Sequence, residues 1–322
     1  MPFRFVLFVC FVVRLTVHEY LGIGAGVDTL VVPSPAKINL FLEVRARRSD
    51  GYHEIESVMQ LVELCDTVRL RRIPQGIRLA VQGANLPGGR ENLAFRAAGL
   101  LLAEFGCPGG VAIELEKRIP VGGGLGGGSS NAAAVMAGLN RLYRLGRSAA
   151  DLRALGARLG SDVPFFFGGG LSLATGRGEI LTDLEGWIPH WVVLANPRVE
   201  VSSAWAYREI SSKLTDGADQ ASITASIAGG CLPWPPTWAY NRLEQAVLPH
   251  HPAIRALRDL LREGGGSPVL MSGSGATVFA VTADGPGAHR LAARASATGA
   301  FAAAVRTLRS NPILRTGESA LS

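Results

Sequence analysis

One glycine-rich stretch constrains this chain more than any other. Residues 120–134 read PVGGGLGGGSSNAAA and contain six glycines. Glycine loses more backbone freedom on ordering than any other residue, so this run predicts a loop rather than the interior of a strand or helix. Ser129, Ser130 and Asn131 favour a helix start, and residues 132–145 combine good helix formers with one apolar face. The sequence therefore predicts a glycine loop that leads directly into a helix.

Such a loop is suited to binding phosphate. Free N–H groups and the positive end of the dipole at a helix start attract anions, and glycine lets a phosphate approach the backbone. Gly122, Gly124 and Gly127 also fit the dinucleotide pattern G-x-G-x-x-G, but a second helical pattern from Asp151 follows where that fold needs a strand. A Walker A loop lacks its Lys-Ser/Thr pair here. A flexible linker is disfavoured because the amphipathic helix follows at once.

Five motifs occur in order along the chain. They are PAKINLFLEV at 35–44, DGYHEIESVMQ at 50–60, GGGLGGGSSNAA at 122–133, SDVPFFFGG at 161–169 and SGSGAT at 272–277. Together they resemble the GHMP kinase superfamily, which includes the galactokinases, homoserine kinases and mevalonate kinases. Within it, they are most similar to the family of 4-diphosphocytidyl-2-C-methyl-D-erythritol kinases.

The resemblance implies a fold and an activity. The expected fold is α+β, a two-domain GHMP kinase fold with an N-terminal ribosomal-protein-S5-domain-2-like α/β domain over 27–183. A C-terminal ferredoxin-like α+β domain follows over 184–310, with a frayed tail over 311–322. The implied reaction is phosphorylation by ATP of the 2-hydroxyl of the family's substrate, giving the 2-phosphate and ADP, in non-mevalonate (MEP pathway) isoprenoid biosynthesis. Mg²⁺ is expected to bind with the nucleotide rather than at a separate metal site.

The resemblance also assigns site residues by position. Lys37 and Asp162 match the catalytic pair. Nucleotide-binding positions are Asn92, Lys117, Pro120, Val121, Gly122, Gly123, Gly124, Leu125, Gly126, Gly127, Gly128, Ser129 and Ser130. Substrate-binding positions are Asn39, Tyr52, His53, Ser203 and Tyr207, with Tyr52 and His53 expected in a cytosine pocket.

Without the resemblance, several of these residues have plainer interpretations. Lys37 is a solvated charge at a strand end, and Asn92 caps the helix predicted after it. Asp162 caps or turns the chain before Val-Pro. His53 is an ordinary exposed ring. Asp151 is predicted to cap the second helix, and residues 28–44 are predicted as strand, turn and strand.

Composition narrows the class of partner. The formal charge of +6 invites a nucleic-acid interpretation, but the basic residues are dispersed, so anionic small substrates explain them equally well. Only three of the 32 basic residues are lysines, and two of those, Lys37 and Lys117, lie beside motifs. Arg and Lys differ in shape and hydration, so this placement indicates sites where a guanidinium would not substitute.

The cysteines and the amino-terminal residues indicate the cellular compartment of the protein. Four scattered cysteines without ligand spacing indicate reduced thiols in a bacterial cytoplasm and no zinc site. The apolar run 5–13 is too short to span a membrane. Since similar kinases start just before the P-A-K motif, we interpret residues 1–26 as a mis-assigned start or a disordered extension. We expect no membrane or nucleic-acid partner, and either a monomer or a homodimer.

Two other functions stay open at this point. A different small-molecule kinase of the superfamily would keep the loop, Lys37 and Asp162, but would not need the Tyr52 and His53 pocket. A noncatalytic nucleotide-binding or RNA-associated protein would keep the loop alone, and strong salt-dependent RNA binding without ATP turnover would identify it.

Overall fold

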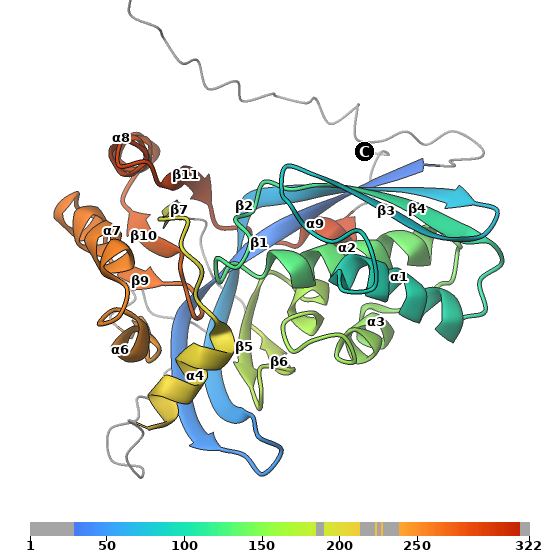
Figure 1. Cartoon of the computed structure of the whole chain (residues 1–322), viewed down its shortest axis with the longest axis horizontal. Coiled ribbons are helices and arrows are strands. Elements are labelled where there is room, and N and C mark those ends of the chain that lie inside the picture. The colour runs from blue at the N-terminus through green and yellow to red at the C-terminus, as the bar shows by residue number, and fades with distance from the viewer. Residues whose placement is uncertain (1–28, 185–189, 213–222, 224–226, 228–237, 316–322) are drawn as a thin grey trace, which may run out of the picture.

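Two sheets organise the computed structural model, which describes residues 29–184, 190–212, 223, 227 and 238–315 (Figure 1). The first sheet contains β1–β6 and β8, and the second contains β7 and β9–β11. The strands are β1 Thr29–Arg47, β2 His53–Ile73, β3 Gly76–Gln82, β4 Gly110–Glu116, β5 Leu171–Thr175, β6 Ile180–Asp183, β7 Trp191–Asn196, β8 Tyr240–Asn241, β9 Val269–Met271, β10 Val278–Thr282 and β11 Phe301–Arg306. The helices are α1 Leu93–Glu104, α2 Gly127–Leu142, α3 Ala149–Gly156, α4 Ser203–Ser211, α6 Glu244–Val247, α7 Pro252–Glu263, α8 Gly285–Ser296, α9 Pro312–Arg315 and the 3-10 turn η1 Pro164–Phe167.

The long hairpin of β1 and β2 forms the centre of the first sheet. The two strands pair antiparallel almost from end to end, and the order continues as β3-β4-β2-β1-β8, with β5 also pairing with β2. Alternate residues of β1 point to opposite faces, which puts Lys37 and Asn39 on the same face. β1 therefore carries a catalytic candidate and a substrate candidate side by side.

Helices α1, α2 and α3 cover one face of the first sheet. α2 is buried along most of its length because small residues dominate it. Gly138 of α2 approaches β1 and β2 so closely that an added Cβ would lie 2.3 Å from Leu70 Cδ1. This close packing fixes the start of α2, and with it the end of the glycine loop, against the central hairpin.

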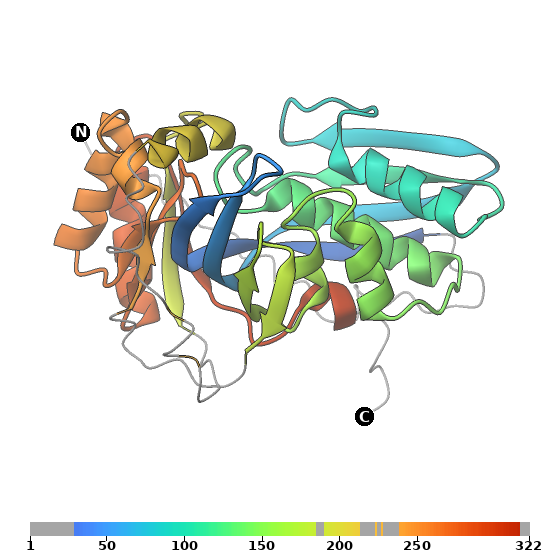
Figure 2. The same ribbon diagram turned by 90° about the horizontal axis from the view of Figure 1, so that it is seen from below.

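The second sheet has the order β11-β7-β10-β9. With helices between β7 and β9 and between β10 and β11, this is a β-α-β-β-α-β unit of the ferredoxin-like type. Figure 2 shows α7 and α8, in orange and red, at one end of the elongated molecule and the green helices of the first unit at the other. The expected α+β, two-domain fold is confirmed.

The two sheets share a core. Along β7, Val193 and Ala195 belong to the cluster under the outer helices, while Val192 and Leu194 pack against apolar residues of β1 and β2. Strand β8, although it lies within the expected second segment, pairs parallel with β1. The first sheet thus includes residues from both predicted segments, and the boundary between 183 and 184 stays a prediction.

The structure corrects two local expectations, one for the first strand and one for the cap of α3. Residues 29–47 form one continuous strand, in which irregular pairing near Pro35 replaces the expected turn. Ser148, not Asp151, caps α3, and Asp151 completes a capping box.

The expected tail over 311–322 is wrong for its first part. Asn311 is buried and donates to the carbonyl of Phe166, and Ile313 of α9 is fully buried in the first core. The expectation for residues 1–26 lies outside the described residues. Among the residues described, no helix combines the length and the apolar character that a membrane span requires.

Candidate active site

The glycine loop has a left-handed backbone at alternate positions. Gly122, Gly124 and Gly126 have φ angles of 65°, 73° and 69°, a region that L side chains rarely adopt. Gly126 is the residue that precedes α2, and no side chain caps the helix there. The first N–H groups of α2 are therefore available to an anion, together with the positive end of the helix dipole.

A turn from the second unit packs against this loop. An added Cβ on Gly124 would lie 2.0 Å from the carbonyl oxygen of Ser272, and one on Gly123 would lie 2.8 Å from Thr277 Oγ1. Ser272 Oγ also donates to Gly124 O at 2.9 Å. The motif SGSGAT at 272–277 thus holds the loop in place.

Lys37 connects this loop to the rest of the site. Its side chain is buried, and Nζ donates to Asn39 Oδ1 at 2.7 Å and to Gly124 O at 2.9 Å. Burial lowers the pKa of Lys37, while the nearby charge of Asp162 opposes that shift. The ammonium group therefore lies where the glycine loop and the catalytic candidates meet.

Asp162 lies next to Lys37. The distance from its Oδ2 to Lys37 Nζ is 3.8 Å, an ion pair that is too long for a hydrogen bond. The carboxylate is 41% exposed, which leaves it accessible from the cleft. Burial and the negative charge of Asp162 both raise the pKa of the Tyr207 hydroxyl, so α4 faces the same carboxylate.

One cleft of about 1500 Å³ brings half of the predicted residues together, including both catalytic candidates and all five substrate candidates. Its lining includes Lys37, Asn39, Tyr52, His53, Gly122, Gly124, Gly126, Asp162, Ser203 and Tyr207. The rings of His53 and Tyr207 stack with centroids 5.5 Å apart, and His53 Nε2 is hydrogen-bonded to Ser211 Oγ. Burial and the charge of Arg47 lower the pKa of His53, which favours a neutral ring. Strand β2 and helix α4 therefore supply an aromatic wall.

Ten of the predicted nucleotide residues do not line this cleft, among them Asn92, Lys117 and Ser130. Asn92 caps α1, with Oδ1 accepting from Ala94 N. Lys117 is buried below the loop in an ion pair with Asp66, and its Nζ lies 3.2 Å from where a Cβ of Gly127 would stand. Ser130 is buried and its hydroxyl accepts from Ser34. Lys117 and Ser130 support the loop from beneath, whereas Asn92 caps α1. The nucleotide contacts predicted for all three residues stay predictions.

Asp66 is a residue that the sequence reasoning missed. Its Oδ1 accepts from the backbone N–H groups of Arg118 and Ile119, at 2.7 and 2.9 Å, and its Oδ2 accepts from Asn131 and Lys117. One buried carboxylate thus fixes the chain on both sides of the glycine loop. Strand β2 carries several other charged residues, so its sequence pattern does not single out Asp66 as the buried one.

Comparisons with known proteins agree with this geometry. The GHMP kinases N terminal domain matches residues 92–170, and the GHMP kinases C terminal domain matches residues 234–300. The 4-diphosphocytidyl-2-C-methyl-D-erythritol kinase of Exiguobacterium sibiricum is 42% identical over 82% of this chain and 92% of its own length. That of Pelotomaculum thermopropionicum is 45% identical over 80% of this chain and 91% of its own. The chain belongs to the 4-diphosphocytidyl-2-C-methyl-D-erythritol kinase family.

Solved structures of other kinases share the fold of this chain. A crystal structure of 4-(cytidine 5'-diphospho)-2C-methyl-D-erythritol kinase superposes with a TM-score of 0.72 at 38% identity, covering 86% of this chain and 99% of that one. A homoserine kinase from Cytophaga hutchinsonii superposes with a TM-score of 0.68 at 20% identity, covering 90% and 98%, which shows a shared fold alone. The expectation of a small-molecule kinase with the GHMP fold is confirmed.

Proposed function

We propose that this chain transfers the γ-phosphoryl group of ATP to the 2-hydroxyl of 4-diphosphocytidyl-2-C-methyl-D-erythritol, giving the 2-phosphate and ADP. One observation carries the proposal. The Lys37 and Asp162 pair lies directly against the glycine loop, joined to it by the 2.9 Å hydrogen bond from Lys37 Nζ to Gly124 O. A phosphate held by the loop and an alcohol held by the pair would therefore be neighbours, as phosphoryl transfer requires.

The loop's part in this reaction is to hold and stabilise negative charge. Its left-handed glycines and the uncapped start of α2 supply backbone N–H groups for the triphosphate. Lys117 lies beneath the same turn, where its ammonium group is paired with Asp66 and helps to fix the backbone of the loop. Fixed donors of this kind stabilise charge that develops in the transition state, because they need no reorganisation during the reaction.

The pair's part is to prepare the acceptor. A hydroxyl placed between the two side chains would donate its proton toward Asp162 while its oxygen accepts from Lys37. The Lys37 ammonium already has donors engaged by Asn39 and Gly124, which hold it in position. Its charge lies 3.8 Å from the Asp162 carboxylate, which is placed to accept or orient the proton.

The residues present fit a nucleotide-bound Mg²⁺. This ion prefers hard oxygen ligands and takes few from the protein when phosphates supply the rest. Ser129, which is partly exposed at the start of α2, would offer a hydroxyl, whereas the Ser130 hydroxyl is buried with Ser34. When bound, Mg²⁺ neutralises charge on the transferred phosphoryl group.

The cleft next to the pair suits a cytidine group. Tyr52 is 54% exposed at its rim, and the stacked rings of His53 and Tyr207 form its wall. Base stacking on aromatic side chains contributes about 1–3 kcal/mol per base. We therefore propose that this side of the cleft selects the acceptor, in the cytoplasm of a bacterial cell.

The proposal is tested by measuring ADP release from ATP and Mg²⁺ with four acceptors: the cytidyl substrate, homoserine, mevalonate and galactose. We expect turnover with the cytidyl substrate alone. Asp162→Asn should lower kcat by about 10²- to 10⁴-fold, the usual contribution of a positioned acid or base, with little change in KM for ATP.

The matched control is Asp259→Asn, which removes a carboxylate from the outer helix α7 and should leave turnover unchanged. Turnover of another acceptor would contradict the substrate while keeping the kinase. An Asp162→Asn variant that keeps the wild-type kcat would contradict the proposed site.

A further inference from the structure

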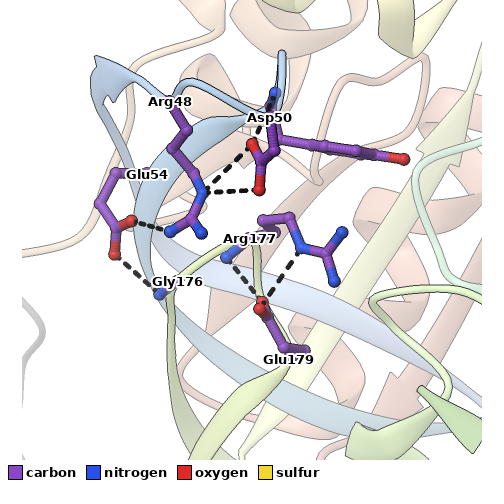
Figure 3. A network of polar contacts seen from close by, with 7 residues as sticks. Arg48, Asp50, Glu54, Gly176, Arg177 and Glu179 are labelled. Atoms are coloured by element: carbon purple, nitrogen blue, oxygen red, sulfur yellow. Dashed lines mark hydrogen bonds and ion pairs between the residues drawn. The ribbon is translucent and has the colours of Figure 1, made fainter. Parts of the chain in front are cut away.

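A polar network at the rim of the cleft joins two hairpins that are far apart in the sequence (Figure 3). Arg48 Nη1 donates to Glu54 Oε2 at 2.6 Å, and Arg48 Nε to Asp50 Oδ2 at 3.1 Å. Glu54 Oε1 in turn accepts from the backbone N–H of Gly176 at 3.0 Å. The turn between β1 and β2 is therefore tied to the turn between β5 and β6.

Arg177, at the tip of the second hairpin, reaches across to Tyr52 on the first. Its guanidinium carbon lies 4.9 Å from the centroid of the Tyr52 ring. Its Nε donates to Glu179 Oε1 at 3.3 Å, and the terminal nitrogens point away from Glu179 in Figure 3. Within the part of the chain that the structure describes, Nη1 and Nη2 have no hydrogen-bond or ion-pair partner. The residue thus holds an exposed aromatic ring and keeps two donor groups available.

The cleft that Arg177 lines has an excess of positive charge. Its cationic lining residues are Lys37, Arg45, Arg47, Arg177 and Arg208, and its acidic ones are Glu54 and Asp162. Lys37 is paired with Asp162, Arg45 with Glu56, and Arg177, through Nε, with Glu179. Glu54 is held by Arg48, so the positive excess of the lining comes from Arg47 and Arg208. The charge balance favours an anionic ligand beyond the catalytic pair, on the side of the cleft where Tyr52 lies.

We propose that Arg177 is a specificity-determining residue, which binds the diphosphate of the cytidyl acceptor while it positions Tyr52 for stacking on the base. This inference rests on the proposed function and adds a subsite to it. The two tasks use different parts of the guanidinium. Stacking on Tyr52 uses its flat face, and binding phosphate oxygens uses the N–H groups along its edge.

The experiment compares affinities for cytidine, CMP, CDP and ADP in the wild type and in Arg177→Gln, by calorimetry in the absence of turnover. We expect the ratio of CDP affinity to cytidine affinity to fall on the order of tenfold in the variant, as for loss of a hydrogen bond to a charged group. ADP affinity should be unchanged. Arg177→Lys keeps the charge and should retain part of the preference for CDP over cytidine. Both variants should bind cytidine somewhat more weakly, because the Tyr52 ring loses the guanidinium stacked on it.

The control is Arg158→Gln, which removes an exposed arginine paired with Glu104 far from the cleft and should change none of these affinities. An unchanged CDP to cytidine ratio in Arg177→Gln would overturn the diphosphate subsite, and so would an equal loss of CDP and ADP affinity. If Arg177→Gln does not fold, added salt should weaken CDP binding to the wild type more than cytidine binding, and equal effects would contradict the proposal. Because these affinities need no turnover, their outcome is independent of whether the wild type phosphorylates the acceptor.

Discussion

At the scale of single residues, the site depends on how the Lys37 ammonium is oriented. Asn39 presents Oδ1 to Lys37 because its Nδ2 donates to Ser57 Oγ at 2.8 Å. Ser57 can only accept that bond, since its own hydroxyl donates to Phe41 O at 2.7 Å. A buried serine of the 50–60 motif, to which the sequence analysis gave no role, therefore determines which way the Asn39 amide faces. This arrangement holds the ammonium between the glycine loop and Asp162.

The titration of Lys37 follows from this environment. Burial lowers its pKa below the ordinary 10.5, and Asp162 counteracts part of the shift. We expect Lys37 to lose its proton at a lower pH than an exposed lysine, and kcat to fall as pH rises through that pKa. In Asp162→Asn the pKa should fall further, because the opposite charge is gone. Carbon-13-labelled lysine makes this measurable by NMR, since the chain has only three lysines.

The assignment of the Lys37 signal is checked with Lys37→Met, in which one of the three lysine signals should disappear. Lys117 provides a second lysine signal for comparison, since its ammonium group is paired with Asp66 rather than with Asp162. A Lys37 pKa that is unaffected by Asp162→Asn would contradict the coupling of the two groups.

At the scale of elements, the glycine loop depends on the turn that packs against it. Gly122 and Gly124 have nearly equal φ angles, 65° and 73°, so alanine at either position costs about 1–2 kcal/mol in backbone strain. Only at Gly124 would the new Cβ meet another atom, Ser272 O at 2.0 Å, while at Gly122 nothing lies within 4 Å. We expect Gly124→Ala to lower the free energy of unfolding by about 1–3 kcal/mol more than Gly122→Ala, the typical cost of overpacking.

Urea unfolding of the two variants measures this difference in the free energy of unfolding. Backbone strain is nearly the same in both variants, so it cancels in the comparison. The KM for ATP should also rise more in Gly124→Ala, because the loop must shift away from residues 272–275. Equal losses of stability in the two variants would show that the contact between the loop and the turn contributes nothing.

The sequence predicts the helices, strands and loops around the site better than it predicts the buried or distant side chains that hold them in place. Local signals correctly predicted that a glycine loop leads into a helix. They placed the start of α2 too late, because the helix begins at Gly127, ahead of Ser129, Ser130 and Asn131, and no side chain caps it. The resemblance also identified ten of the residues that line the cleft. Asp66, Ser57 and Arg177 were missed, because their partners are distant in sequence and no local pattern connects them. Likewise, the turn expected near Pro35 is absent because pairing with β2 continues past it.

At the scale of the whole molecule, part of the predicted second segment packs against the first sheet. Arg242 follows β8 and donates to both carboxylate oxygens of Glu43 on β1, with Nη2 to Oε2 at 2.9 Å. The Glu43 side chain is fully buried and that of Arg242 is 12% exposed. Val62 and Thr307 form a further bridge between the two sheets. The two units therefore share contacts that are internal to the core, and we expect them to unfold together.

The pair of Glu43 and Arg242 allows a test of this coupling. Arg242→Met leaves the buried Glu43 carboxylate without its guanidinium partner, and breaking a buried pair in this way costs about 3–5 kcal/mol. The exposed pair of Arg158 and Glu104 is the control, because removing a surface ion pair costs about 0–1 kcal/mol. The double variant Glu43→Gln with Arg242→Met removes both charges and should recover part of the loss. Calorimetry should show one transition, shifted to lower temperature in Arg242→Met. Two separated transitions would mean that the units unfold independently, and a shift no larger than that of Arg158→Gln would mean that this buried pair does not couple them.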